Sequence, residues 1–192
     1  MSYIEIIKES DATDELANLY KRFGNPDGSV DNVLKVHSLN PASLDAHCAL
    51  YVQSCHKSSP VSRAEREMIG VTVSRINKCT YCQTHHAAGL KRLLPDDRKH
   101  IADEVFNDNL TNLTDRESAM ISYASTLTTD PSSITQQSID QLRAVGITDR
   151  DILDIVQVAA YFAYANRVVL GLGANLGTDE GEIGQIPEES RS

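Results

Sequence analysis

The stretch Ser62–Leu90, SRAEREMIGVTVSRINKCTYCQTHHAAGL, decides the fold of this chain. Its first residue and Glu65 have the spacing of a capping box, which predicts a helix that runs to about Ile76. After a short connection, a second helix carries a CxxC pair and ends before Pro95. Two helices joined by so short a turn form an αα-hairpin, which we expect over residues 62–94.

The same helix punctuation recurs along the rest of the chain. Thr114 with Glu117 repeats the capping box, and Thr148 with Asp151 is an acidic variant of it. No segment shows the strict alternation of apolar and polar residues that is typical of a strand. The sequence therefore predicts an all-α protein. The other expected helices lie between Asp11 and Gly24 and at about 30–37, 41–57, 96–107, 115–129, 136–145 and 149–172.

Length and composition favour one domain. A chain of 192 residues with 41% hydrophobic content buries an ample core. We expect a single helical domain over residues 1–172, in which residues 1–57 form a helical extension to the hairpin. Residues 173–192 are acidic and contain glycine, and we expect this tail to be poorly ordered unless a partner subunit holds it.

Charge and hydropathy exclude several kinds of partner. The formal charge is −9, and no basic cluster is present to neutralise a phosphate backbone, so nucleic acid is not an expected partner. The most apolar segment, 152–170, is interrupted by Asp154, Gln157, Asn166 and Arg167, which predicts a buried helix rather than a membrane span. The first thirty residues lack an apolar stretch of signal-peptide length. We therefore expect a cytoplasmic protein, whose reducing surroundings disfavour structural disulfides.

The CxxC pair, Cys79 and Cys82, falls in the first turn of its helix. Unpaired backbone N–H groups there lower a thiol pKa and so favour the reactive thiolate. The two residues share one helix face and are close enough to form a disulfide. His86 follows the second cysteine by four residues and His85 by three, and this spacing alone does not decide which imidazole serves the thiol.

Glu67 is the candidate acid of the preceding helix. If the hairpin reverses near Asn77, a residue ten positions before the turn lies roughly opposite His86. A glutamate beside the apolar face of this helix would be costly if buried alone, so we expect it to have a partner. Carboxylate, imidazole and thiol would then form a proton relay.

These residues resemble a known family. The glutamate twelve residues before a CxxC pair, and the histidine four residues after it, are similar to the AhpD-like alkylhydroperoxidase branch of the carboxymuconolactone decarboxylase superfamily. The resemblance is strongest over residues 62–90, extends to LTDRESAMISYASTLT (113–128) and ITDRDILDIVQVAAYFAYANRVV (147–169), and is closest to the peroxidase-related subgroup. It implies an AhpD-like helical bundle that assembles as a homo-oligomer.

The resemblance also implies site roles and partners. Cys82 would be the peroxidatic thiol and Cys79 the resolving thiol, with Glu67 and His86 as the proton relay. The substrate would be a hydroperoxide, and a lipoyl or thioredoxin-like dithiol would reduce the disulfide. No cofactor or metal is expected. The chain departs from some family members in carrying Tyr81, where they have a histidine within the CxxC.

Two alternatives use the same residues. Cys79, Cys82 and either His85 or His86 could hold zinc, with Glu67 or a residue of another subunit as the fourth ligand. This would make the chain a zinc-stabilised or redox-sensing protein without turnover. The second alternative is a non-redox decarboxylase or lyase of the same superfamily, although such relatives generally lack the CxxC.

Overall fold

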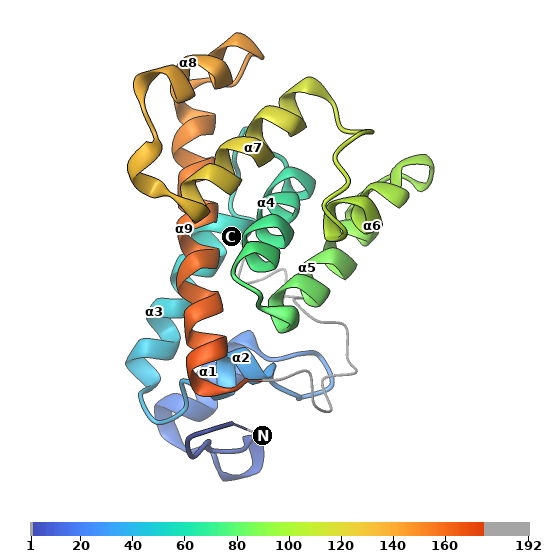
Figure 1. Ribbon diagram of the computed structural model, residues 1–192. Helices are drawn as coiled ribbons and strands as arrows, with labels where there is room; N and C mark the ends of the chain where they lie inside the picture. The colour runs from blue at the N-terminus through green and yellow to red at the C-terminus, as the bar shows by residue number, and fades with distance from the viewer. Residues whose placement is uncertain (1, 175–192) are drawn as a thin grey trace. The chain divides into compact units, whose positions relative to one another are not determined.

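The computed structural model describes residues 2–174, and every regular element in this range is a helix (Figure 1). The all-α prediction is therefore confirmed. The described residues divide into two compact units, one formed by residues 58–166 and the other by residues 2–57 together with residues 167–174. The predicted acidic tail lies, from residue 175 onward, outside the described residues.

The unit that contains the N-terminal residues is built from short helices. They are the 3₁₀ turn η1 (Glu9–Asp11), α1 (Asp14–Phe23), α2 (Asn32–Lys35), α3 (Pro41–Tyr51) and the π-helical turn η2 (Val52–His56), joined by the end of α9 (Asp149–Leu172). Their shared core consists of Leu16, Leu19, Tyr20, Phe23, Val30, Leu34, Leu44, Cys48 and Val52. Cys48 and Cys55 are buried in this unit, as expected for cysteines that pack as small apolar side chains.

One predicted helix start in this unit was wrong. Asp11 does not cap α1, because it ends the 3₁₀ turn and the helix begins at Asp14 after Thr13. In contrast, Asn40 caps α3 as its position before a proline indicates, since its side chain accepts a hydrogen bond from the Ser43 N–H.

The second unit contains the predicted hairpin. Helices α4 (Arg63–Ile76) and α5 (Thr80–Leu93) form it, and α4 also packs against α6 (His100–Phe106) and α7 (Asp115–Thr129). The 3₁₀ turns η3 (Asp96–Arg98) and η4 (Pro131–Ser133), α8 (Gln136–Ala144) and residues 149–166 of α9 complete the unit.

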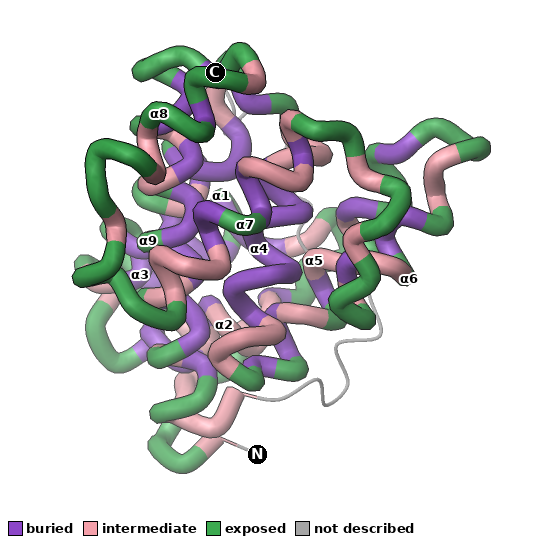
Figure 2. Tube along the Cα trace, turned by 45° about the horizontal axis from the view of Figure 1, so that its top comes forward, coloured by how far each residue is buried: buried purple, intermediate pink, exposed green. Residues whose placement is uncertain are grey.

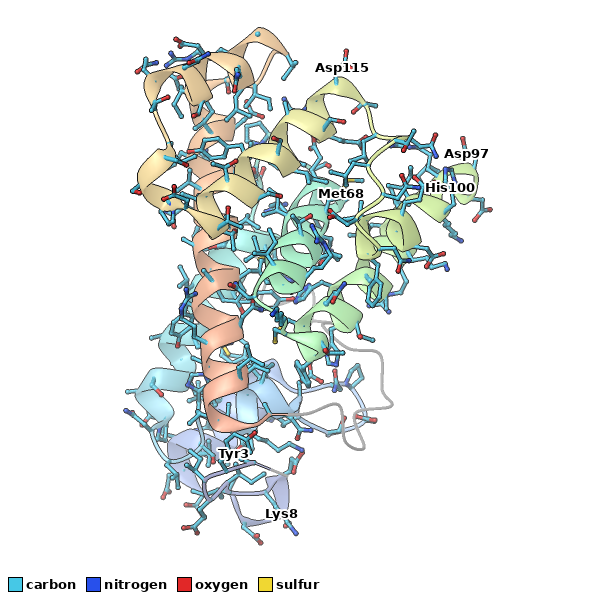
Figure 3. The ribbon with its side chains drawn as sticks, viewed as in Figure 1. Tyr3, Lys8, Met68, Asp97, His100 and Asp115 are labelled. Atoms are coloured by element: carbon cyan, nitrogen blue, oxygen red, sulfur yellow. The ribbon has the colours of Figure 1, made fainter. Side chains whose placement is uncertain are left out.

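Helix α4 is the central element of this unit. All residues from Arg66 to Ser74 are buried, and the tube of α4 is correspondingly purple in Figure 2. Met68, which Figure 3 labels on this helix, is fully buried. A helix surrounded on all sides has no solvent face, so each polar side chain on it needs a partner within the protein.

The helix caps of this unit are linked by arginines. The capping boxes at Ser62 and Thr114 are both formed. Arg116 on α7 contacts the capping carboxylate of Glu65 at 2.7 Å and that of Asp151 on α9 at 2.7 Å. The carboxylates that cap α4 and α9 thus share one cation, which fixes the starts of three helices relative to one another.

Glu117→Gln is expected to lower the free energy of unfolding at pH 7 by about 2 kcal/mol. Glu117 accepts two hydrogen bonds from Arg98, at 3.1 and 2.8 Å, and also caps its own helix at Thr114. Burial alone would raise the pKa of this carboxyl, but these hydrogen bonds hold it below 4.5. The stabilisation is therefore present above pH 4.5 and is lost as the pH falls through the lowered folded pKa.

Urea denaturation at several pH values measures this effect. The difference between Glu117→Gln and the wild type should shrink as the solution is acidified. Asp115→Asn, which changes an exposed carboxylate in the same helical turn, is the control and should cost no more than about 0.5 kcal/mol. A difference that stays constant on acidification would contradict the assigned role.

Helix α9 is long and apolar enough to cross a membrane, judged by length and composition alone. Within residues 149–166, however, Ile155, Val158 and Phe162 are buried inside the unit. Asp151 and Asn166 on the same helix form hydrogen bonds with neighbouring helices. These contacts are those of a core helix in a helical bundle.

Candidate active site

The hairpin turn places the CxxC pair at the start of α5. Asn77 ends α4, and Lys78 adopts the left-handed conformation with a φ of +58°. Cys79 then occupies the N-cap position of α5, and its N–H donates to the Ser74 carbonyl at 2.9 Å. Cys82 is the third residue of α5, so both cysteines lie at the positive end of the helix.

The two thiols are reduced and in contact. Both side chains are buried, and their sulfur atoms lie 3.2 Å apart. The hydrogen bond between the two thiols lowers the pKa of Cys79 to about 7 against the opposing effect of burial. The same hydrogen bond, together with burial, raises the pKa of Cys82. The resting pair therefore carries its negative charge on Cys79 near neutral pH.

Glu67 and His86 form the second part of the site. Glu67 lies on α4 and is only 8% exposed, and its Oε2 is 2.6 Å from Nδ1 of His86 on α5. Gly89 lies one turn further along α5, where a Cβ would stand 3.4 Å from the Glu67 carboxyl carbon, so the carboxylate packs against the backbone of α5 at this point. The partner expected for a buried Glu67 is present.

The ring of Phe162 supports the imidazole of His86. The two rings meet edge to face, with centroids 4.5 Å apart. Phe162 comes from α9 and packs directly over Gly70, where a Cβ would stand only 2.5 Å from the ring. The absence of a side chain at Gly70 is what allows the phenyl ring to reach His86.

His85 takes a different position from His86. It is buried, its ring lies 4.1 Å from that of Tyr81, and burial lowers its pKa to about 3. His85 is therefore a neutral side chain packed within the bundle near neutral pH. The contact with Glu67, which spacing alone could not assign, belongs to His86.

No group of three or more metal-ligating side chains is found within residues 2–174. The Glu67–His86 pair and the two thiols are the features of this site that can carry chemistry. The arrangement combines a lowered thiol pKa, a second thiol in contact with it, and a carboxylate-bound imidazole, which suits proton-coupled thiol chemistry.

Comparisons with known proteins identify the family. The model of the carboxymuconolactone decarboxylase family matches residues 46–102. The crystal structure of an uncharacterized peroxidase-related protein from Silicibacter sp. TM1040 is 30% identical, covers 97% of this chain and 100% of its own, and has a TM-score of 0.79. The chain belongs to the AhpD-like branch of the carboxymuconolactone decarboxylase superfamily.

Other solved structures agree with this AhpD-like assignment. An uncharacterized peroxidase-related protein from Ralstonia eutropha JMP134, described as an alkylhydroperoxidase AhpD core, is 25% identical, with 97% of each chain covered and a TM-score of 0.84. A debrominase shares the fold with a TM-score of 0.74 at 17% identity, covering 98% of this chain and 96% of its own. No curated protein matches the chain.

One polar residue of this AhpD-like site was not predicted from the sequence as part of it. Asn166 interrupts an apolar helix, a pattern that is compatible with lining the active-site pocket or with a structural contact and that favours the contact. In the structure it is fully buried and donates a hydrogen bond to Ser74, the residue whose carbonyl accepts from Cys79. The signal in the sequence was a single amide in an otherwise apolar helix face, which requires a buried polar partner.

Proposed function

We propose that the chain is a thiol-dependent hydroperoxide reductase that uses Cys79 and Cys82 as its redox pair. The observation that carries this proposal is the buried Glu67–His86 contact beside two reduced thiols at a helix N-terminus. A structural cysteine pair needs no imidazole held by a carboxylate, whereas a thiol that attacks a peroxide needs a base.

Because the pKa of Cys82 is raised, this thiol needs a base to lose its proton near neutral pH. In the proposed reaction, Nδ1 of His86 is held by Glu67, and Nε2 takes the proton from the Cys82 thiol. The negative charge of Glu67 stabilises the imidazolium that forms. The Cys82 thiolate then attacks the terminal oxygen of the hydroperoxide. The O–O bond breaks, Cys82 becomes a sulfenic acid, and the leaving alkoxide takes the proton from the imidazolium.

Cys79 completes the proposed cycle as the resolving thiol. Its thiolate attacks the sulfur of the Cys82 sulfenic acid, a disulfide forms, and the displaced hydroxide is protonated to water. The sulfur atoms start 3.2 Å apart, so little movement is needed to close the bond. A lipoyl or thioredoxin-like dithiol would restore both thiols by exchange.

Thiol counting by mass spectrometry tests this proposal. One equivalent of alkyl hydroperoxide is expected to remove two alkylatable thiols and to join Cys79 and Cys82, while Cys48 and Cys55 stay reduced. Addition of a dithiol such as dihydrolipoamide should return both thiols. Oxidation that affects all four cysteines equally, or none, would contradict the proposal.

Two competing functions give different results with the same protein. A zinc protein purified without chelator would contain stoichiometric zinc by elemental analysis. A lyase of the decarboxylase branch would keep its activity in the Cys79→Ser, Cys82→Ser double variant, whereas the proposed reductase would lose it. We also expect a cytoplasmic homo-oligomer, which analytical ultracentrifugation of the full chain would test.

A further inference from the structure

Asn166 stands directly behind the hairpin turn. It lies on α9 with none of its surface exposed. Its Oδ1 accepts a hydrogen bond from Nδ2 of Asn77 at 3.0 Å, and its Nδ2 donates to Oγ of Ser74 at 3.1 Å. These two partners fix the orientation of the amide, because its oxygen faces a donor and its nitrogen faces an acceptor.

The same turn holds the reactive thiols. The Ser74 carbonyl accepts the N–H of Cys79, so the residue that orients the Asn166 amide also positions the N-cap cysteine. An amide nitrogen carries two hydrogen atoms, and Ser74 uses one of them. The Asn166 amide also hydrogen-bonds to the thiols, and this contact acts to lower the pKa of Cys79 and of Cys82.

We infer that Asn166 is a hydrogen-bond donor to the CxxC dithiol, oriented by Ser74 and Asn77, and that it stabilises the thiolate on whichever sulfur carries the charge. Both sulfur atoms are buried away from water, so a thiolate there needs donors from the protein. Hydrogen bonds to a charged acceptor are stronger than those to a neutral one, and the amide therefore favours the thiolate over the thiol.

This inference extends the proposed function, since the thiolate is the form that would attack a peroxide. It differs from a purely structural role, in which Asn166 would only tie α9 to the end of α4. A structural tie affects stability, whereas a donor to sulfur also affects the proton affinity of the thiol.

The pH dependence of thiol alkylation separates these two roles. The rate of iodoacetamide modification of Cys79 is followed by mass spectrometry from pH 5 to pH 10. For the wild type, the rate should rise with a midpoint of about 7. In Asn166→Leu, which keeps the side-chain volume, the midpoint should move up by about one unit, and the rate at pH 6 should fall about tenfold.

Asn166→Ala is measured in parallel, so that the result does not depend on the folding of one variant. Leu142→Ala is the control, because it opens a cavity at a fully buried position on α8 and loosens the same unit without a change beside the thiols. Its midpoint should remain at the wild-type value.

An unchanged midpoint in folded Asn166→Leu and Asn166→Ala proteins, with helical circular dichroism like that of the wild type, would overturn the inference. A shift that Leu142→Ala reproduces would overturn it as well. The measurement uses no peroxide. A shifted midpoint in a protein without peroxide turnover would therefore support the role of Asn166 and refute the proposed function separately.

Discussion

Cys82→Ser is expected to lower hydroperoxide turnover by at least about 1,000-fold, because serine cannot attack the O–O bond and Cys82 is the thiol that attacks in the proposed reaction. The measurement is the initial rate of alkyl hydroperoxide consumption with dihydrolipoamide as the reductant. Cys48→Ser is the matched control. It changes a buried cysteine of the other unit and should keep the wild-type rate if the protein folds.

Cys79→Ser should behave differently from Cys82→Ser. Without a resolving thiol, Cys82 should be oxidised once and remain as a sulfenic acid, which dimedone traps and mass spectrometry locates. This variant tests the assignment of the two roles, because the lowered pKa of Cys79 puts the resting charge on the sulfur that we propose as the resolving one. Dimedone found on Cys79 in the Cys82→Ser variant, after rapid oxidation, would show that the two cysteines have the opposite roles.

Much of the fold was predictable because helix caps are local. The capping pairs at Ser62 and Thr114 lie within four residues of sequence, and both form as expected. The start of α1 was predicted wrongly because the local signal for a cap lies before the actual start of the helix. Asp11 has the composition of a cap but belongs to a preceding 3₁₀ turn, and Thr13 at the actual start makes no side-chain capping bond.

The candidate site was predictable only as far as the hairpin determines it. Glu67 and His86 belong to consecutive helices joined by a short turn, so counting residues across the turn placed them opposite each other, and the two side chains do meet. Spacing on α5 alone could not separate His85 from His86, since the choice depends on α4. The supports from α9 are further away still, and no local pattern relates Phe162 to Gly70 or Asn166 to Ser74.

The arginine links between the caps show the same limit. The sequence predicts that Glu65 and Asp151 cap their helices, and it gives no indication that both also bind Arg116. The spacing between these residues along the chain is too long for any helix periodicity to connect them. Local sequence determines at which residue these helices start. Where the starts of α4, α7 and α9 lie in space relative to one another depends on contacts such as those of Arg116, which belong to the tertiary structure.

Glu67→Gln is expected to lower kcat/KM for an alkyl hydroperoxide by about 100-fold near neutral pH. Glutamine has nearly the same shape and can still accept a hydrogen bond from His86, so the ring should keep its place beside Phe162. The variant loses the negative charge that stabilises the imidazolium formed when Cys82 is deprotonated. The loss should therefore appear in the rate of oxidation and not in the rate of disulfide reduction.

Stopped-flow measurement of a single oxidation by excess peroxide isolates this step. The rate of Glu67→Gln should rise with pH well above neutral, as hydroxide replaces the missing base, and the gap to the wild type should narrow. Glu65→Gln, two residues earlier on α4, removes a charge from the cap and its Arg116 contact. It should lower stability while leaving the oxidation rate of the folded protein near that of the wild type. The pKa of the Cys82 thiol is raised, so its deprotonation by His86 should slow when the negative charge of Glu67 is removed. Equal oxidation rates for Glu67→Gln and the wild type would therefore show that the carboxylate has only a structural role.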